Sequence, residues 1–311
     1  MGKFLIVHPD ELSQKWIDRL KDLGTDTLGI HSVGGGSAHE HLASMIELQK
    51  NDEVKALFNI ATENGLNIEY ELHAASYLLP RELFGTHPEY FRVDANGERT
   101  TNANFCVSNK EALDFVSNRA AELAEALYAS SDKFYFWLDD GKDLHCHCEK
   151  CRELSPSDQQ LLALNSMLEA IKEKLPNAKL AYLAYCTTTD APKKIKPHKD
   201  IFLEYAPFER DRKLPARVMS EAERENLARL FEVFGKKDSK ILEYWYDNSM
   251  FSGWTKPPKA MTVDNEMVID DVSFYRELGF ENIGSFACYL GSDYEELHGE
   301  PDLSAFKNVQ T

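Results

Sequence analysis

Two hydrophobic periods alternate along the 311 residues of this chain, and this alternation restricts the fold to a few architectures. Short runs rich in Ile, Val, Phe, Tyr and Leu are bounded by Gly, Asp, Asn or Pro, which is typical of β-strands. Polar turns follow these runs, and most are then followed by segments with helical periodicity. The predicted strands are Phe4–Val7, Thr27–His31, Asn67–His73, Phe134–Leu138, Lys179–Tyr185, Ile201–Tyr205, Lys240–Tyr246 and Asn282–Cys288.

Helical patterns fill most of the segments between the strands. Several of them end at a glycine just past the last apolar position, for example at Gly235 and Gly279, and such glycines commonly terminate helices. Ser108 and Ser157 stand at the start of two patterns and are expected to act as N-caps. The predicted helices are Glu11–Leu23, His39–Asn64, Lys110–Ala129, Ser157–Leu175, Glu221–Phe234 and Asp264–Leu278.

Eight strands that alternate with helices predict βα units and a parallel sheet. Eight such units in 311 residues favour a closed (β/α)8 TIM barrel over an open doubly wound sheet. The fifth helix is expected to be missing because residues 184–200 contain two prolines and no helical period, and only a short helix near Leu303–Val309 is expected after the last strand. No repeat or linker divides the chain, so residues 1–311 are interpreted as one barrel domain.

Composition argues against several classes of partner. The 52 acidic and 35 basic side chains give a net charge of −17, which is unfavourable for binding nucleic acid or anionic lipid. No apolar run approaches the roughly 18 residues that span a bilayer. The apolar stretch Phe4–Val7 is shorter than the hydrophobic region of a signal peptide, which needs about 7 residues or more. We therefore expect a cytoplasmic protein that binds neither nucleic acid nor membrane.

In a parallel barrel, functional residues lie at the carboxyl ends of the strands and in the loops that follow them. Here those positions hold many carboxylates and aromatic rings. Carboxylates can act as acids and bases, and flat rings can stack on the faces of pyranose sugars, so the set favours a carbohydrate site. Glu71 and the catalytic candidates are expected to converge on one mouth of the barrel. The candidates are, for catalysis, Asp139, Asp140, Glu204 and Glu243, and, for substrate binding, Glu71, His73, Tyr205, Trp245, Tyr246 and Tyr289.

Asp139 and Asp140 end the run YFWLDDG at the close of the fourth predicted strand. Two adjacent carboxylates repel each other, so their pKa values tend to separate and one carboxyl keeps its proton. A carboxyl that is protonated near neutral pH is what general acid catalysis requires. The structural alternative is that Asp139 caps a turn with Gly141 and that Asp140 is simply solvated.

Three of the six cysteines crowd into the segment HCHCEKC, as Cys146, Cys148 and Cys151. Three thiolates at this spacing can surround one Zn²⁺, which then needs one further ligand. Cys106 is the best candidate, because it lies in the loop after the third strand and neighbouring barrel strands bring their loops together. A site with four cysteines has no open position for water, so the predicted zinc is structural.

Other interpretations of these cysteines remain open at this point. His145 or His147 could replace Cys106 and give a site with three cysteines and one histidine. Free thiols packed in a long loop are a second alternative, and a redox role is a third, although no thioredoxin-like context surrounds the motif. Cys186 and Cys288 stand singly on strands and are expected to be ordinary buried residues.

One ordered series of segments resembles a known family. It contains PRELFGTHPEYFRVDANGERTTNANFCVSN from residue 80, then LDDG and CHCEKCREL, then APFERDR at 206–212 and EYWYDNSMFSGW at 243–254. The series resembles the domain of unknown function numbered 4838, a group that is similar to hexosaminidase-like and α-glucuronidase-like barrels. Some members are classed in glycoside hydrolase family 163, endo-β-N-acetylglucosaminidases that act on N-glycans. The resemblance implies a glycosidase barrel whose substrate is a glycan containing N-acetylglucosamine.

The resemblance to hexosaminidase-like barrels also implies roles. Those barrels carry two carboxylates after the fourth strand: the first orients the substrate's acetamido group, which is the nucleophile, and the second protonates the leaving oxygen. By this resemblance Asp139 orients and Asp140 is the acid; we add Tyr246 as a candidate hydrogen-bond partner of the acetamido group. The second carboxylate is commonly Glu in hexosaminidases, so Asp140 reaches one methylene less far. A conventional nucleophile would instead be Glu204 or Glu243.

Two other functions compete with a glycoside hydrolase. A zinc-dependent hydrolase or isomerase on the same barrel would need three protein ligands, normally His or carboxylate, and an open fourth position. The thiolate-rich loop favours a structural zinc over that arrangement. A carbohydrate-binding barrel without catalysis is the second competitor, because one barrel fold hosts many functions.

Overall fold

A computed structural model describes residues 2–308. Each strand pairs in parallel with the next one along the chain, and β1 pairs with β8, so the sheet closes into a barrel. This confirms the predicted (β/α)8 fold, with all eight strands near their predicted positions. The strands are β1 (Gly2–Val7), β2 (Thr27–Ile30), β3 (Asn67–His73), β4 (Lys133–Trp137), β5 (Lys179–Ala184), β6 (Ile201–Tyr205), β7 (Lys240–Glu243) and β8 (Asn282–Phe286).

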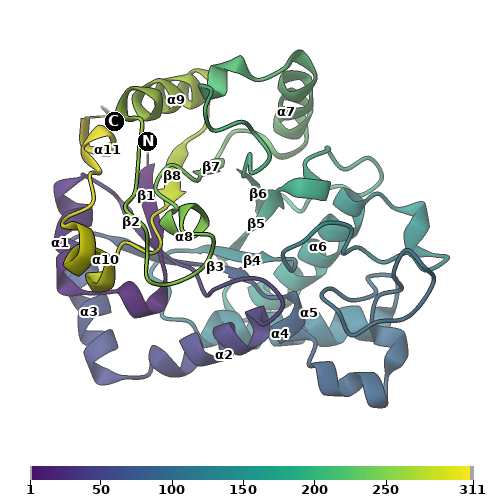
Figure 1. The fold of residues 1–311 in the computed structure, drawn as a ribbon. Helices are drawn as coiled ribbons and strands as arrows, with labels where there is room; N and C mark the ends of the chain where they lie inside the picture. The colour runs from purple at the N-terminus through teal and green to yellow at the C-terminus, as the bar shows by residue number, and fades with distance from the viewer. Residues whose placement is uncertain (1, 309–311) are drawn as a thin grey trace.

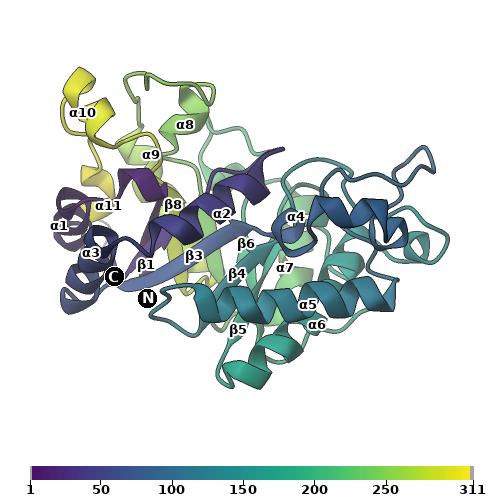
Figure 2. The ribbon, with the colours of Figure 1, turned by 90° about the horizontal axis from the view of Figure 1, so that it is seen from below.

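Helices surround the strands, which lie at the centre of the molecule (Figure 1). Seen after a 90° turn, α8 and α10 lie on the opposite side of the molecule from α5 and α6 (Figure 2). The α-helices are α1 (Gln14–Asp22), α2 (Ala38–Leu48), α3 (Asp52–Glu63), α4 (Ala75–Leu78), α5 (Lys110–Ala126), α6 (Pro156–Lys174), α7 (Glu221–Phe234), α8 (Asn248–Phe251), α9 (Asn265–Leu278), α10 (Ser292–His298) and α11 (Ser304–Asn308). Short 3-10 turns are η1 (Pro9–Glu11), η2 (Arg81–Gly85), η3 (Pro88–Tyr90), η4 (Cys151–Glu153), η5 (Cys186–Thr188) and η6 (Ala216–Val218).

Several helix boundaries differ from the prediction. The single helix expected over His39–Asn64 is two helices, α2 and α3, because the Asn51 side chain accepts the backbone N–H of Glu53 and starts a new helix. The N-caps of α5 and α6 are Asn109 and Ser155, which lie one residue after and two residues before the predicted positions. Asn and Ser side chains that accept local backbone N–H groups decide where these helices start, and several such residues compete within a few positions.

The irregular fifth and eighth connections follow the prediction. Between β5 and β6, where the structure describes every residue, the chain forms only the 3-10 turn η5. After β8 the described chain forms two short helices; α11 was expected, α10 was not, and Val309 lies outside the described residues. The Lys3 ammonium at the start of the barrel donates to the Phe306 carbonyl at 2.9 Å, which fastens α11 to β1. No helix within residues 2–308 has the length and apolar character needed to cross a membrane.

The interior of the barrel has a charged layer and, nearer the carboxyl ends of the strands, an aromatic layer. Lys240, the first residue of β7, is buried inside the barrel and donates a hydrogen bond to Glu71. Its Nζ also lies 3.6 Å from a carboxylate oxygen of Glu69 and 3.9 Å from one of Glu204. Because side chains alternate along a strand, the residues two positions further on form the next layer, toward the carboxyl ends. That upper layer lines the cavity described next.

Candidate active site

A cavity of about 420 Å³ opens at the carboxyl ends of the strands, and every strand contributes a residue at or near its end. The volume lies within the range of about 300–1,000 Å³ that is usual for small-molecule sites. The strand-end rule for barrels therefore locates the site correctly. Its walls include three histidines, a group of aromatic rings and two carboxylates.

The histidines are His8, His31 and His73, at the ends of the first three strands. The Nδ1 atoms of His8 and His31 lie 2.9 and 2.7 Å from the carbonyl oxygens of His31 and Glu71, and that of His73 lies 2.6 Å from the Leu138 carbonyl. A carbonyl only accepts, so each Nδ1 carries the hydrogen and each Nε2 is left for a ligand. Burial lowers the pKa of His8 and His31, so these two rings are neutral near pH 7 and their Nε2 atoms accept hydrogen bonds.

Aromatic rings form one continuous wall of the cavity. Tyr185, Phe208, Tyr244 and Phe286 follow one another with ring centroids 5.5, 5.2 and 5.4 Å apart. Trp137, at the end of β4, lines the cavity beside His31 and His73. Such rings offer flat apolar faces with polar edges, which suit the faces of a sugar.

The two cavity carboxylates are Asp140, after β4, and Asp247, after β7. Asp140 is exposed, and its Oδ1 accepts the Tyr185 hydroxyl at 2.9 Å. Asp247 is buried, and its Oδ1 caps α8 by accepting the backbone N–H groups of Ser249 and Met250 at 3.2 and 3.3 Å. This leaves Oδ2 of Asp247 as the oxygen available to a ligand. Burial raises the pKa of Asp247.

Of the residues proposed from the sequence for catalysis and substrate binding, three line this cavity: Asp140, His73 and Tyr289. The Tyr289 ring lies 6.0 Å from His8 between centroids. The other seven lie elsewhere, so the expected convergence of five carboxylates on one mouth is not what the structure shows.

Asp139 lies behind the wall that holds Asp140. It lines a separate hollow of about 40 Å³ that adjoins the main cavity. Its Oδ1 accepts the Ser76 N–H and hydroxyl at 3.1 and 3.0 Å, and its own N–H donates to the Asn104 side chain at 2.9 Å. Oδ2 is buried without a hydrogen-bond partner among the described residues, and burial raises the pKa of the carboxyl. Asp139 therefore has a raised pKa, as Asp247 does, but it lies outside the cavity that holds Asp140 and Asp247.

Glu71 and Glu204 lie one layer below the cavity, in the charged interior. Both are completely buried, and both belong to the group around Lys240. Trp137 separates Glu204 from the cavity, because its indole N–H donates to Glu204 at 2.7 Å. Neither glutamate lines the space in which a substrate would bind.

Glu243 and Trp245 point away from the cavity because of the alternation along β7. Lys240, Leu242 and Tyr244 face inward, so the residues between them face the helices. Glu243 accepts the Arg210 guanidinium at 2.7 Å on this outer side. A nucleophile at this position would not meet a substrate in the cavity.

The remaining two predicted residues, Tyr246 and Tyr205, also pack on the outer side, as Trp245 does. The Trp245 indole N–H donates to Asp271 at 2.9 Å. Tyr246 packs its ring edge-on against Phe306, with centroids 6.2 Å apart, and Tyr205 stacks on Phe280 at 6.3 Å. They are part of the core between the strands and the helices.

The sequence analysis missed five important cavity residues. His8 and His31 come directly after β1 and β2, so the strand-end rule would have found them had it been applied to those two strands. Tyr244 follows from counting in twos along β7, and Tyr185 likewise along β5. Asp247 comes directly after the predicted strand Lys240–Tyr246, so the strand-end rule places it at the mouth, but it was given no role; the observed strand ends earlier, at Glu243, and a turn leads to Asp247.

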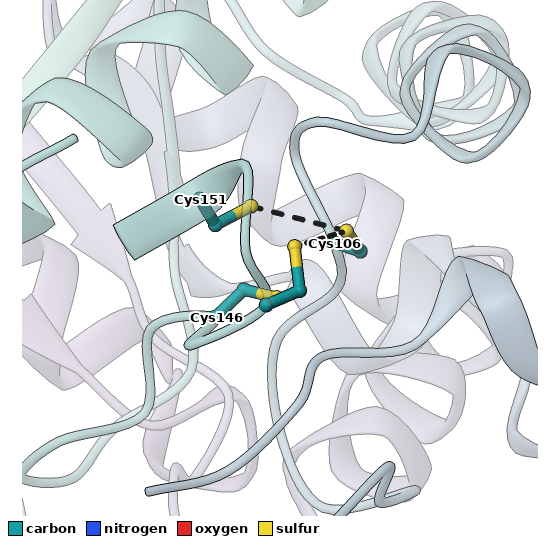
Figure 3. A group of neighbouring side chains, drawn as sticks. Cys106, Cys146 and Cys151 are labelled. Atoms are coloured by element: carbon teal, nitrogen blue, oxygen red, sulfur yellow. Dashed lines mark hydrogen bonds between the residues drawn. The ribbon is translucent and has the colours of Figure 1, made fainter. Parts of the chain in front are cut away.

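The four cysteines proposed as zinc ligands come together away from the cavity. Their sulfur atoms all lie within 4.8 Å of one another, and none of the four lines the cavity. Figure 3 shows Cys106, from one segment, facing Cys146 and Cys151, which belong to a second segment. Cys186 is half-buried and Cys288 is buried, and neither belongs to the group.

Several solved structures that share this fold are glycoside hydrolases. A GH20 catalytic module of the pneumococcal exo-β-D-N-acetylglucosaminidase StrH matches with a TM-score of 0.54 and 12% identity, over 99% of this chain and 82% of that chain. A β-galactosidase from Marinomonas ef1 matches with 0.54 and 12%, over 92% and 54% of the two chains. A GH5-4 broad-specificity endoglucanase from an uncultured bacterium matches with 0.53 and 11%, over 96% and 84%. At these identities the likeness establishes the barrel fold.

Comparison with curated proteins finds no match. The sequence profile of a family described as "Domain of unknown function (DUF4838)" matches residues 40–298. The matched range includes strands β3 to β8, the two cavity carboxylates and the four gathered cysteines. The match confirms the resemblance seen in the sequence, and the chain belongs to the DUF4838 family.

Proposed function

We propose that this protein is a retaining glycoside hydrolase that cleaves the bond of a β-linked N-acetylhexosamine of the N-acetylglucosamine type. One observation carries the proposal: Asp140 and Asp247, which follow β4 and β7, line a single cavity with an aromatic wall. Most glycosidases place a pair of carboxyl groups around the bond that they cleave. The sugar's own acetamido group acts as the nucleophile, as in substrate-assisted glycosidases.

Asp140 is the general acid and base of this scheme. It lies at the exposed edge of the cavity, where a leaving group has access to solvent. Its carboxyl protonates the glycosidic oxygen as the bond from C1 to that oxygen breaks and the acetamido oxygen bonds to C1. Water then attacks C1, the carboxylate takes the water proton, and the acetamido group is restored. Two displacements at C1 leave the configuration unchanged.

Asp247 and Tyr244 hold the acetamido group. Asp247 is buried, so little water competes for its carboxylate, and its Oδ2 accepts the acetamido N–H. Burial and the neighbouring Asp247 raise the pKa of Tyr244, so the phenol keeps its proton and donates it to the acetamido oxygen. These two cavity residues take the roles that the sequence analysis suggested for Asp139 and Tyr246.

The histidines and the aromatic wall supply the rest of the sugar site. The sugar ring stacks on the aromatic wall of the cavity. The Nε2 atoms of His8 and His31 accept hydrogen bonds from the sugar hydroxyls. The likeness to a module of an exo-β-D-N-acetylglucosaminidase supports an N-acetylated sugar, since it extends over 99% of this chain.

The test is a screen of chromogenic β-glycosides and intact N-glycans with the wild-type protein and with Asp140→Asn and Asp247→Asn. We expect turnover of N-acetylglucosaminides, none of the matching glucosides, and a loss of about 10²–10⁴-fold in each variant. Asp52→Asn is the matched control, because that side chain is fully exposed on α3, and it should keep full activity. Binding of glycans without any turnover would favour the non-catalytic carbohydrate-binding barrel instead.

A second set of measurements tests the nucleophile. A thiazoline mimic of the cyclised acetamido intermediate should inhibit the enzyme. A glycosyl ester trapped on Asp247 by a fluorinated substrate would show a conventional double displacement. Asp139→Asn and Tyr246→Phe should reduce turnover less than Asp247→Asn and Tyr244→Phe; the reverse order would restore the roles suggested by the sequence analysis.

A further inference from the structure

Two long connections meet at the gathered cysteines. Cys106 lies in residues 79–109, between α4 and α5, where regular structure is limited to the turns η2 and η3 and two isolated bridges. Cys146, Cys148 and Cys151 lie in residues 138–155, between β4 and α6. Cys106 Sγ lies 3.7 Å from Cys148 Sγ and 3.8 Å from Cys151 Sγ (Figure 3). The cysteines are therefore one point at which the two connections are in contact.

The spacing of the sulfur atoms fits a tetrahedral metal site. Zinc–sulfur bonds of about 2.3 Å in a tetrahedron place neighbouring sulfur atoms about 3.8 Å apart. The separations of 3.7 and 3.8 Å agree with that value, and Cys106, Cys146 and Cys151 are buried. All four thiols are free, so no disulfide competes for them.

Hydrogen-bonding groups lie beside two of the sulfur atoms. The Val93 N–H points at Cys146 Sγ from 3.3 Å, and the Ser108 hydroxyl lies 3.0 Å from Cys151 Sγ. Hydrogen bonds from the second shell hold metal-bound thiolates in place and offset part of their charge.

The two histidines of the motif do not belong to this group. His145 and His147 alternate with Cys146 and Cys148, and their rings lie tilted against each other with centroids 4.2 Å apart. Both face Asp143, whose Oδ1 lies 3.2 Å from His145 and 2.9 Å from His147. The ligand set is thus four cysteines, and the alternative with one histidine is not favoured.

We propose that Cys106, Cys146, Cys148 and Cys151 bind one Zn²⁺, and that this zinc acts as a clamp that positions the Asp139–Asp140 segment at the cavity. The second half of this proposal rests on the proposed function. The link is Asn104, two residues before Cys106. Its side chain accepts the N–H of Asp139 at 2.9 Å and donates to the carbonyl of Leu144 at 3.1 Å. Asn104, two residues from the proposed ligand Cys106, therefore holds the segment that contains Asp139 and Asp140.

Helix α6 anchors the other side of the clamp. Gln159 accepts the N–H of Cys146 and donates to the carbonyls of Cys146 and Cys151, each at 3.0 Å. Ligation fixes the position of Cys106 relative to this anchor, and Asn104 transmits that position to Asp139. Without zinc, four thiols that repel one another when ionised would leave the connection 79–109 free to shift.

Metal content is the first test. We expect one zinc per purified chain, with X-ray absorption showing four sulfur ligands at about 2.3 Å. Cys106→Ser and Cys146→Ser should reduce zinc content well below one per chain, while Cys186→Ser and His147→Ala should keep it. Zinc far below one per chain in the wild type, or disulfides among the four cysteines by mass spectrometry, would overturn the site.

The positioning role has its own readout. Asn104→Ala should keep one zinc per chain, lower kcat at least tenfold, and change KM little. Removal of zinc with a chelator should lower the melting temperature and kcat together, and both should return when zinc is restored. An unchanged kcat in Asn104→Ala with zinc bound would refute the positioning role of the zinc, while the zinc site itself would stand. If no glycoside is turned over at all, zinc content and melting temperature still decide whether the metal site exists.

Discussion

The indole N–H of Trp137 donates a hydrogen bond of 2.7 Å to Oε2 of Glu204, and this contact separates the interior of the barrel into two layers. Above it, Trp137 lines the cavity. Below it, Glu204 belongs to a group of three glutamates around Lys240. The lower layer is charged but completely closed, so its role is to support the upper layer. Buried acids in a barrel interior are therefore not sufficient to mark a catalytic centre.

Replacement of the buried lysine should destabilise the fold strongly. Lys240→Met leaves Glu69, Glu71 and Glu204 without their cation, and breaking a buried ion pair from one side costs about 3–5 kcal/mol. Urea unfolding near pH 7 measures the change. Lys110→Met is the control, because that side chain is exposed on α5, and it should change the free energy of unfolding by no more than about 0.5 kcal/mol. Equal stability of both variants would show that the interior group does not support the fold.

Loss of Glu243 should affect stability far more than catalysis. Its carboxylate accepts from Arg210 at 2.7 Å and from the Tyr275 hydroxyl at 2.5 Å, all on the outer side of β7. Glu243→Gln weakens a buried charged hydrogen bond, at a cost of about 1.5–3 kcal/mol. At temperatures where the variant stays folded, kcat should remain within a few-fold of the wild type. A large fall in kcat, or a substrate ester on this residue, would bring Glu243 back as the nucleophile.

The fold could be predicted from the sequence because each strand is a compact apolar run between polar turns. Eight runs in one chain left the closed barrel as the simplest solution, and the proline-rich connection 184–200 correctly indicated a missing helix. Helix α10 was missed because it is short and largely polar, with a glycine at each end. The division at Asn51 was missed because one side-chain hydrogen bond decides it.

Prediction of the site residues depended on placing the end of each strand correctly to within one residue. Asp140 and His73 were found, but a strand drawn to Tyr246 assigned Trp245 and Tyr246 to the cavity instead of Tyr244. Since alternate residues face opposite sides, an error of one position exchanges the cavity for the outer core. The four cysteines were easier, because three of them are close in sequence and the fourth follows from the order of neighbouring strands.

Stability should fall as the pH rises from about 5 to 8, and Glu11 should account for a large part of the fall. This residue lies in η1 close to His8, and the backbone N–H of His8 donates to Glu11 Oε2 at 3.1 Å. Burial raises the pKa of Glu11 from 4.5 to about 8. Between these values the unfolded chain has released the proton and the folded chain retains it, so folding becomes less favourable with increasing pH.

Glu11→Gln should remove this dependence. The total effect is at most about 5 kcal/mol, from about 1.4 kcal/mol for each pKa unit. Urea unfolding at pH 5, 6.5 and 8 should show the wild type losing stability and the variant losing clearly less. Glu300→Gln is the control, because Glu300 is exposed and its pKa is lowered by Lys15, so it should not flatten the curve. Parallel curves for Glu11→Gln and the wild type would show that Glu11 ionises normally in the folded protein.

The identity of the acid can be tested through the leaving group. If Asp140 protonates the departing oxygen, its removal should matter most where that oxygen is strongly basic. Asp140→Ala should therefore lose about 10²–10⁴-fold in kcat/KM on substrates with poor leaving groups such as sugars. With an activated aryl leaving group the first step needs little protonation, so the loss should be much smaller.

Asp247→Ala provides the comparison within the same cavity. Asp247 is proposed to hold the acetamido group, which every substrate of this class carries, so its removal should reduce turnover of activated and unactivated substrates by similar factors. The two variants should thus differ in their dependence on the leaving group although both residues line one cavity. If Asp140→Ala loses equally on both substrate classes while Asp247→Ala discriminates between them, the assignments are exchanged: Asp247, whose pKa burial raises, is the acid and Asp140 is the orienting carboxylate.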